Sequence, residues 1–128
     1  ECACGKREQM SVFGDDYDTP DGSCIRDYIH IDDLASAHLS VLEFLTKHQK
    51  SEIFNVGYGK GYSVFEVIKC VKEVSGVDFV VTQDSRRAGD PAILFADTQK
   101  IRNLTKWSPK LDDLSTIIKS AWEWEKYL

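Results

Sequence analysis

The sequence has few of the features that mark specialised protein classes. Its 128 residues include three prolines and one methionine. No apolar run approaches the roughly 20 residues that cross a bilayer, and no basic start precedes an apolar stretch as in a signal peptide. A composition of 42% hydrophobic and 29% charged residues is typical of one soluble globular domain, residues 1–128. We therefore expect a cytoplasmic protein with no membrane partner.

A dense basic cluster is also absent. The net charge is −5, and the lysines and arginines are scattered along the chain. Non-specific binding of nucleic acid requires a concentrated basic surface, so the sequence predicts no nucleic-acid partner. The net charge still permits a small anionic ligand, because a few converging arginines can hold one diphosphate.

The cysteines have neither a disulfide framework nor metal-binding spacing. Cys2 and Cys4 lie close together, but no second Cys/His pair follows at a suitable distance. Cys70 falls on the apolar side of an expected helix, where a free thiol is a common small hydrophobe. We predict reduced thiols, as in cytosolic proteins, and no metal site. His38, on an expected apolar helix face, is interpreted as a packed histidine.

Short apolar runs and helical periodicities alternate along the chain. Strands are expected at residues 10–13, 53–56 and 79–82, with a turn-rich acidic loop at residues 15–22. A helix is expected to begin at Asp32 or Asp33. Its apolar face is predicted from residues at helical spacing: Leu34, Ala35, His38, Leu39, Leu42 and Leu45.

The later helices have clearer boundaries. Ser63 and Glu66 form the pattern of a capping box, and Gly76 stands where a helix C-terminal glycine belongs. Asp97 is expected to cap a short helix, and Pro109 separates that helix from a last amphipathic one. The order of elements predicts a small mixed α/β fold with a thin sheet.

Residues 57–61, GYGKG, lie between an expected strand and the capped helix, where a dinucleotide-binding loop would stand. The spacing is GxGxG, whereas the fingerprint is GxGxxG, so we favour a tight turn over a nicotinamide site. The helix start at Ser63 is a further candidate for contact with an anion. The carboxylates of residues 15–22 do not match a calcium loop and are interpreted as a solvated turn.

Two arginines stand out as candidate phosphate ligands. Arg26 and Arg87 lie on separate loops and could converge on phosphate oxygens. The alternative is ion pairing within the chain, for which Asp27 and Asp90 are neighbouring partners. The tryptophans suggest either a carbohydrate-stacking surface or core packing, and packing is favoured for Trp107, next to Pro109, and for Trp122.

Three stretches carry a resemblance to a known family: VFGDDYDTPDGSCIRDYIHIDDLASAH, IFNVGYGKGYSVFEVI and SRRAGDPAILFADTQKIRNLTKW. In this order and spacing, together with the Trp-bearing last helix, they resemble the C-terminal portion of the UDP-glucose 4-epimerases. These enzymes are a branch of the extended short-chain dehydrogenase/reductase family. The resemblance covers nearly the whole chain.

The resemblance implies an α/β enzyme of two parts. The N-terminal Rossmann domain would hold NAD, and this chain would be the small mixed α/β domain that binds the UDP-sugar. It implies contacts of Arg26 and Arg87 with the diphosphate, of Asp90 with a ribose hydroxyl, and of the Ser11 and Phe13 backbone with uracil. Three further residues are implied in the site: Val64 would line the nucleotide pocket, Tyr28 would order the arginine loop, and Leu94 would stand at the hexose end.

One part of the family pattern is missing. None of the five tyrosines is followed four residues later by a lysine, so the catalytic Tyr-x-x-x-Lys pair of the family is not in this sequence. We therefore expect part of an NAD-dependent isomerase that interconverts UDP-glucose and UDP-galactose, with no catalytic residue, NAD site or activity in this chain. The expected partners are a UDP-sugar and the Rossmann half, within a homodimeric parent. The alternatives are a related epimerase or dehydratase, and a non-catalytic UDP-sugar-binding module.

Overall fold

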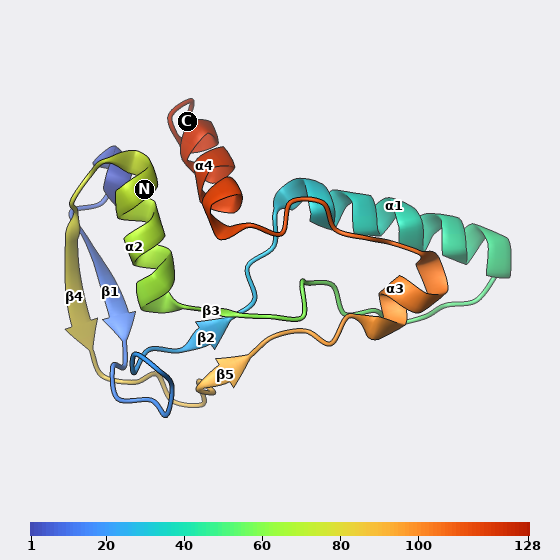
Figure 1. Cartoon of the computed structure of the whole chain (residues 1–128), viewed down its shortest axis with the longest axis horizontal. Helices are drawn as coiled ribbons and strands as arrows, with labels where there is room; N and C mark the ends of the chain where they lie inside the picture. Colours follow the sequence, from blue (N-terminus) through green and yellow to red (C-terminus); the bar gives the residue numbers. More distant parts are fainter.

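The computed structural model describes all residues from 1 to 128 and has two hydrophobic cores joined by a small sheet. Figure 1 shows an elongated chain, with one core at each end and the sheet between them. No helix is long and apolar enough to cross a membrane. The predicted mixed α/β fold is confirmed.

The first core lies between a parallel strand pair and two helices. Strands β1 (Gln9–Phe13) and β4 (Val80–Asp84) pair in parallel, with Gln9 opposite Val80. Helix α2 (Val64–Ser75) packs against this pair, and helix α4 (Leu114–Glu125) packs against α2. The short 3-10 helix η1 (Cys2–Cys4) closes one end. The buried centre consists of Val12, Ile68 and Phe79.

The second core lies between helix α1 (Ile31–His48) and helix α3 (Gln99–Thr105). Its buried residues are Ala37, Ile101 and Trp107. The Trp107 ring nitrogen donates a hydrogen bond to Ser36 Oγ at 2.9 Å, which confirms the packing interpretation of this tryptophan. Trp122 is only half-buried.

A three-stranded sheet connects the two cores (Figure 1). Strand β2 (Ile25–Arg26) lies in the centre, antiparallel to β3 (Tyr62–Ser63) and parallel to β5 (Ile93–Leu94). Each strand has only two residues, so few ladder hydrogen bonds hold β2 in register. Contacts beyond the ladder therefore matter for the position of β2.

Several local predictions are confirmed. Ser63 accepts from the Glu66 amide while the Glu66 side chain accepts from the Ser63 amide, so the capping box is formed. Gly76 ends α2 with φ 70°, a conformation that glycine adopts at low cost. The predicted strand at residues 10–13 is β1, and that at residues 79–82 overlaps β4.

The prediction for helix α1 is wrong in its cap and in its buried face. His30 is the N-cap residue, and its ring accepts a hydrogen bond from the Asp32 amide at 3.1 Å. The face that packs against α3 carries Asp33 and Ala37, whereas Leu39 and Leu42 are 64% and 57% exposed. His38 is exposed as well, so it is not a packed histidine.

Two smaller predictions also differ from the structure. Residues 53–56 form no strand, because no other segment of the chain pairs with them, and Ile53 is 83% exposed. Thr98, not Asp97, occupies the N-cap position of α3. Asp97 nevertheless accepts a hydrogen bond from the Gln99 amide at 3.0 Å, so its role at the helix start is partly as expected.

Candidate UDP-sugar site

The acidic loop before β2 is tied to the rest of the chain. Asp21 Oδ1 accepts from the amide and hydroxyl of Ser23 at 2.9 and 2.8 Å, and its Oδ2 accepts from the Ser63 hydroxyl. Burial alone would raise the pKa of Asp21, but these hydrogen bonds outweigh it and lower the pKa below its ordinary value. Asp16 forms an ion pair with Arg86 at 2.5 Å. Both carboxylate residues are exposed, as expected of a solvated turn, and their hydrogen bonds also tie the turn to the rest of the chain.

The start of α2 is occupied by groups of the same chain. The amide of Val64 donates to Cys24 O at 3.0 Å, that of Phe65 to Ser23 Oγ at 3.3 Å, and that of Glu66 to Ser63 Oγ at 3.0 Å. A helix N-terminus attracts an anion through unpaired N–H groups. The candidate anion contact at Ser63 is therefore not supported.

Arg26 and Asp90 form an ion pair that joins β2 to the loop before β5. Arg26 Nη2 lies 2.8 Å from Asp90 Oδ1, and Nη1 donates to the carbonyl of Ile25 at 2.8 Å. Both side chains are partly exposed. Burial would lower the pKa of the Arg26 guanidinium, whereas the bond to Asp90 raises it, with a net rise. The alternative of an internal ion pair is thus realised, with Asp90 and not Asp27 as the partner.

Arg87 is free of polar partners. Its guanidinium carbon lies 3.7 Å from the centroid of the Phe13 ring, a cation–π geometry. The other four arginines each form an ion pair or a side-chain hydrogen bond. Asp90 donates its amide to Arg87 O at 3.3 Å, so this turn brings Arg87 close to the Arg26–Asp90 pair. Arg87 therefore presents free hydrogen-bond donors on the loop that also carries Asp90, the partner of Arg26.

Leu94 lies on the same row of the sheet as Arg26. The register pairs Arg26 with Leu94 on β5 and with Tyr62 on β3, and side chains opposite one another lie on one face. Leu94 is 58% exposed. Tyr28 follows two residues after Arg26, and burial raises the pKa of its hydroxyl. Arg26, Leu94 and Tyr62 thus form one exposed edge of the candidate site.

Ser11 and Phe13 line a cavity of about 640 Å³. Strand β1 pairs only with β4, so backbone groups on its other edge are unpaired, and Ser11 Oγ lies 3.0 Å from Thr82 Oγ1 on β4. Arg87 also lines this cavity, but Arg26, Tyr28, Val64, Asp90 and Leu94 do not. The rest of the lining is mostly apolar and comes from η1, β1, α2, α4 and Phe79. The cavity therefore brings together only three of the predicted site residues: Ser11, Phe13 and Arg87.

The glycine turn at residues 57–61 packs tightly against β2. A Cβ atom on Gly57 would overlap Asp27 Oδ2, and one on Gly61 would lie 2.5 Å from Ile25 Cγ2. These glycines serve close packing within the chain, and their open side is filled. Gly59, between them, is open, with Thr98 Oγ1 at 3.7 Å as the nearest atom to a Cβ, so the GxGxG spacing and not the packing argues against a dinucleotide loop.

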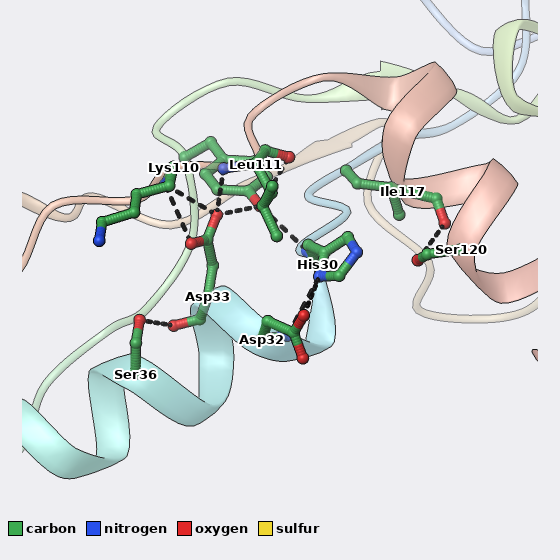
Figure 2. A network of polar contacts seen from close by, with 9 residues as sticks. His30, Asp32, Asp33, Ser36, Lys110, Leu111, Ile117 and Ser120 are labelled. Carbon is green, nitrogen blue, oxygen red and sulfur yellow. Dashed lines mark hydrogen bonds and ion pairs between the residues drawn. The ribbon is translucent and has the colours of Figure 1, made fainter.

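A buried polar network lies where α1 begins. Figure 2 shows Asp33 with hydrogen bonds from the amides of Lys110 and Leu111, at 2.9 and 2.8 Å. The Tyr58 hydroxyl donates to Asp33 Oδ2 at 2.8 Å and accepts from the His30 amide at 3.0 Å. Asp33 and Tyr58 are 3% and 7% exposed. The network joins three segments that are far apart in the sequence.

The sequence reasoning missed Tyr62 and the roles of Asp27, Asp33 and Tyr58. Strands of two residues are too short to show an alternating pattern, so the sequence does not reveal that Tyr62 shares a face with Arg26. The contacts of Asp27, Asp33 and Tyr58 are all long-range, so no local pattern predicts them. All four cysteines are free thiols, and no cluster of three or more His, Cys, Asp or Glu side chains is placed to hold a metal ion.

Comparison with known proteins confirms the resemblance. The pattern of the NAD dependent epimerase/dehydratase family matches residues 2–57. A UDP-glucose 4-epimerase from Halalkalibacterium halodurans is 48% identical over 126 residues, which is 98% of this chain and 38% of the relative. The chain thus spans well under half the length of this curated relative.

Solved structures give the same result. The UDP-Glc/GlcNAc 4-epimerase from Campylobacter jejuni is 61% identical, with a TM-score of 0.91, over 100% of this chain and 39% of that one. The UDP-glucose 4-epimerase from Bifidobacterium longum, in complex with NAD+ and UDP, is 35% identical, with a TM-score of 0.87. The match covers 98% of this chain and 37% of that one. This chain is therefore homologous, over nearly its whole length, to one portion of the UDP-glucose 4-epimerases of the NAD dependent epimerase/dehydratase family.

Proposed function

We propose that this chain is the UDP-sugar-binding part of an epimerase that interconverts UDP-glucose and UDP-galactose. The observation that carries the proposal is the guanidinium of Arg87, which has no polar partner, lies 3.7 Å from the centroid of the Phe13 ring and stands three residues before Asp90, the partner of Arg26. Two guanidinium groups from separate segments suit the two phosphates of a nucleoside diphosphate, because each can donate two parallel hydrogen bonds.

The other site residues complete this assignment. The free edge of β1 at Ser11 and Phe13 offers backbone groups to the uracil ring, and Asp90 accepts from a ribose hydroxyl. Val64 and Tyr28 shape the pocket on either side of the arginine loop. Leu94, exposed beside Arg26 in the sheet, meets the hexose. The known UDP complex of the Bifidobacterium longum homologue supports UDP as the ligand.

The oxidation and reduction steps belong to other parts of the parent enzyme. This chain has no Tyr-x-x-x-Lys pair, and its glycine turn does not have the GxGxxG spacing of a dinucleotide loop. We therefore assign NAD to residues outside this chain. The purified 128-residue chain with added NAD is expected to convert no UDP-galactose to UDP-glucose, and measurable conversion would contradict this assignment.

Isothermal titration calorimetry with UDP tests the site. Arg26→Ala and Arg87→Ala are each expected to weaken UDP binding by about 10- to 100-fold, because a hydrogen bond to a charged group is worth roughly 1.5–3 kcal/mol. Lys47→Ala, at the far end of α1, removes the same charge and serves as the control. If the chain does not bind UDP, or if neither arginine variant weakens binding, the proposed site is wrong.

The exposed face of α1 is proposed as the contact surface for the partner, a polypeptide corresponding to the unmatched part of the relatives. Ile31, Leu39, Leu42 and Leu45 are 43–68% exposed along one helix. Contiguous apolar surface of this kind is rare in monomeric proteins. The nearby residues 53–56 pair with no strand of this chain, and Ile53 is 83% exposed. That the parent is a homodimer stays a prediction.

Sedimentation velocity tests this surface. The chain alone is expected to self-associate with rising concentration, and a Leu39→Ser/Leu42→Ser variant to do so less. Leu128→Ser is the control, because Leu128 is 74% exposed but belongs to the C-terminus. A chain that remains monomeric at all concentrations would contradict the assignment of this face.

A further inference from the structure

The position of Arg26 depends on a two-residue strand. Strand β2 pairs with β3 and β5 through two residue pairs each, which is a short ladder on both sides. Ladders of this length fray easily, because so few residue pairs offset little of the entropy cost of ordering the chain. Arg26 occupies the last position of β2, so it lies where fraying begins.

Asp27 lies directly after this last position and connects to both neighbouring segments. Its Oδ2 accepts a hydrogen bond from the amide of Ala96 at 3.1 Å, two residues beyond β5. Its Oδ1 accepts a longer bond of 3.4 Å from the amide of Tyr58, on the segment that leads into β3. One carboxylate therefore closes the same end of all three strands.

The carboxylate of Asp27 lies close against Gly57. A Cβ atom on Gly57 would overlap Asp27 Oδ2, so this glycine makes room for the oxygen. Asp27 forms no ion pair with Arg26, whose partner is Asp90. The carboxylate therefore acts on Arg26 through the backbone and not through charge neutralisation.

We propose that Asp27 is a positioning residue for the diphosphate site, which holds Arg26 in register with Leu94 without contacting the ligand. This inference rests on the proposed UDP site. The Asp27→Asn variant keeps the shape of the side chain but turns one acceptor oxygen into an NH2 group. That group faces a backbone N–H, so one of the two bonds is lost and the end of the sheet loosens.

A double-mutant cycle read by calorimetry tests the inference. Asp27→Asn is expected to weaken UDP binding by about tenfold, with less than about a twofold effect on uridine, which has no phosphate. In the Arg26→Ala background, Asp27→Asn is expected to have no further effect on UDP, because Asp27 acts only through Arg26. Asp18→Asn, on the exposed loop, is the matched control.

The outcomes separate the two proposals. If the wild-type chain does not bind UDP, the proposed site fails and the inference fails with it. If Arg26→Ala weakens UDP binding but Asp27→Asn does not, or if the two effects add, only the inference is overturned. Equal weakening of UDP and uridine by Asp27→Asn would also overturn it, since that indicates a general structural role.

A second variant covers the case in which Asp27→Asn does not fold. Gly57→Ala keeps the Asp27 side chain but displaces its Oδ2. It is expected to reproduce the selective loss of UDP affinity and the absence of a further effect in the Arg26→Ala background. A Gly57→Ala chain that folds and binds UDP as the wild type does would overturn the positioning role.

Discussion

Replacing Tyr58 by Phe should destabilise the chain through the loss of hydrogen bonds of the hydroxyl, to Asp33, His30 and Leu111, and not through packing. The phenylalanine ring fills the same space, so only the hydroxyl is lost. The hydroxyl donates to Asp33 at 2.8 Å and accepts from the His30 amide at 3.0 Å. His30 is 5% exposed, so water cannot replace the acceptor that its amide loses.

The expected loss of unfolding free energy is about 2–3 kcal/mol. A hydrogen bond to a charged group contributes roughly 1.5–3 kcal/mol, and a buried N–H without a partner costs about 1–3 kcal/mol. The two terms are not additive, because Asp33 keeps the amides of Lys110 and Leu111 as donors. Since the network joins residues 30–33, 58 and 110–111, its loss should weaken the connection between the two cores (Figure 2).

Equilibrium unfolding in urea, followed by circular dichroism, measures this loss. Tyr127→Phe is the matched control, because Tyr127 is 83% exposed and its hydroxyl has no hydrogen-bond partner in the chain. The control should change the unfolding free energy by less than about 0.5 kcal/mol. If Tyr58→Phe changes it no more than the control does, the network does not stabilise the junction.

Three further changes are expected in the unfolding free energy measured in urea. Burial, together with the hydrogen bond to Asp33, raises the pKa of Tyr58 to about 12. The stabilisation by the protonated Tyr58 hydroxyl is thus fully present below about pH 10, and up to about 3 kcal/mol of it is lost as the pH rises through 12. The Tyr58→Phe variant should lack this loss. The backbone and Tyr58 hydrogen bonds to Asp33 outweigh its burial and lower its pKa, so the advantage of the wild type over Asp33→Asn should shrink as the pH falls below about 4 and should stay constant between about pH 5 and pH 9. Gly22 and Gly89 have φ values of 82° and 81°, but only at Gly22 would a Cβ overlap the Asp15 carbonyl. Gly22→Ala and Gly89→Ala should each lose about 1–2 kcal/mol of unfolding free energy from the left-handed conformation. Gly22→Ala should lose more in total because of the overlap with the Asp15 carbonyl, and an equal loss for the two variants would contradict the role of that contact.

The patterns that predicted helix ends correctly are local ones. Ser63 and Glu66 are three residues apart, and each satisfies a backbone group of the other within one helical turn. Gly76 is similar, since a left-handed residue is needed directly after the last turn. Such interactions depend on neighbours in the sequence, so the sequence is sufficient to predict them.

The buried face of α1 could not be predicted in this way. The helix has apolar residues on two faces, and periodicity alone does not tell which one meets α3. The face with Asp33 and Ala37 is buried because the Tyr58 hydroxyl and the Lys110 and Leu111 amides satisfy the carboxylate there. The more apolar face, with Leu39 and Leu42, has no element of this chain packed against it.

The amino-acid sequence by itself determined the resemblance to the epimerases, the two ends of helix α2 and the residue types of the candidate diphosphate site. Only the tertiary structure decided that Arg26 pairs with Asp90, that Arg87 lies free over Phe13, and that Asp27 closes the end of β2. The physical reason is the range of the interactions. Caps and turns are satisfied within a few residues, whereas ion pairs, stacked rings and sheet contacts depend on which distant segments the fold brings together.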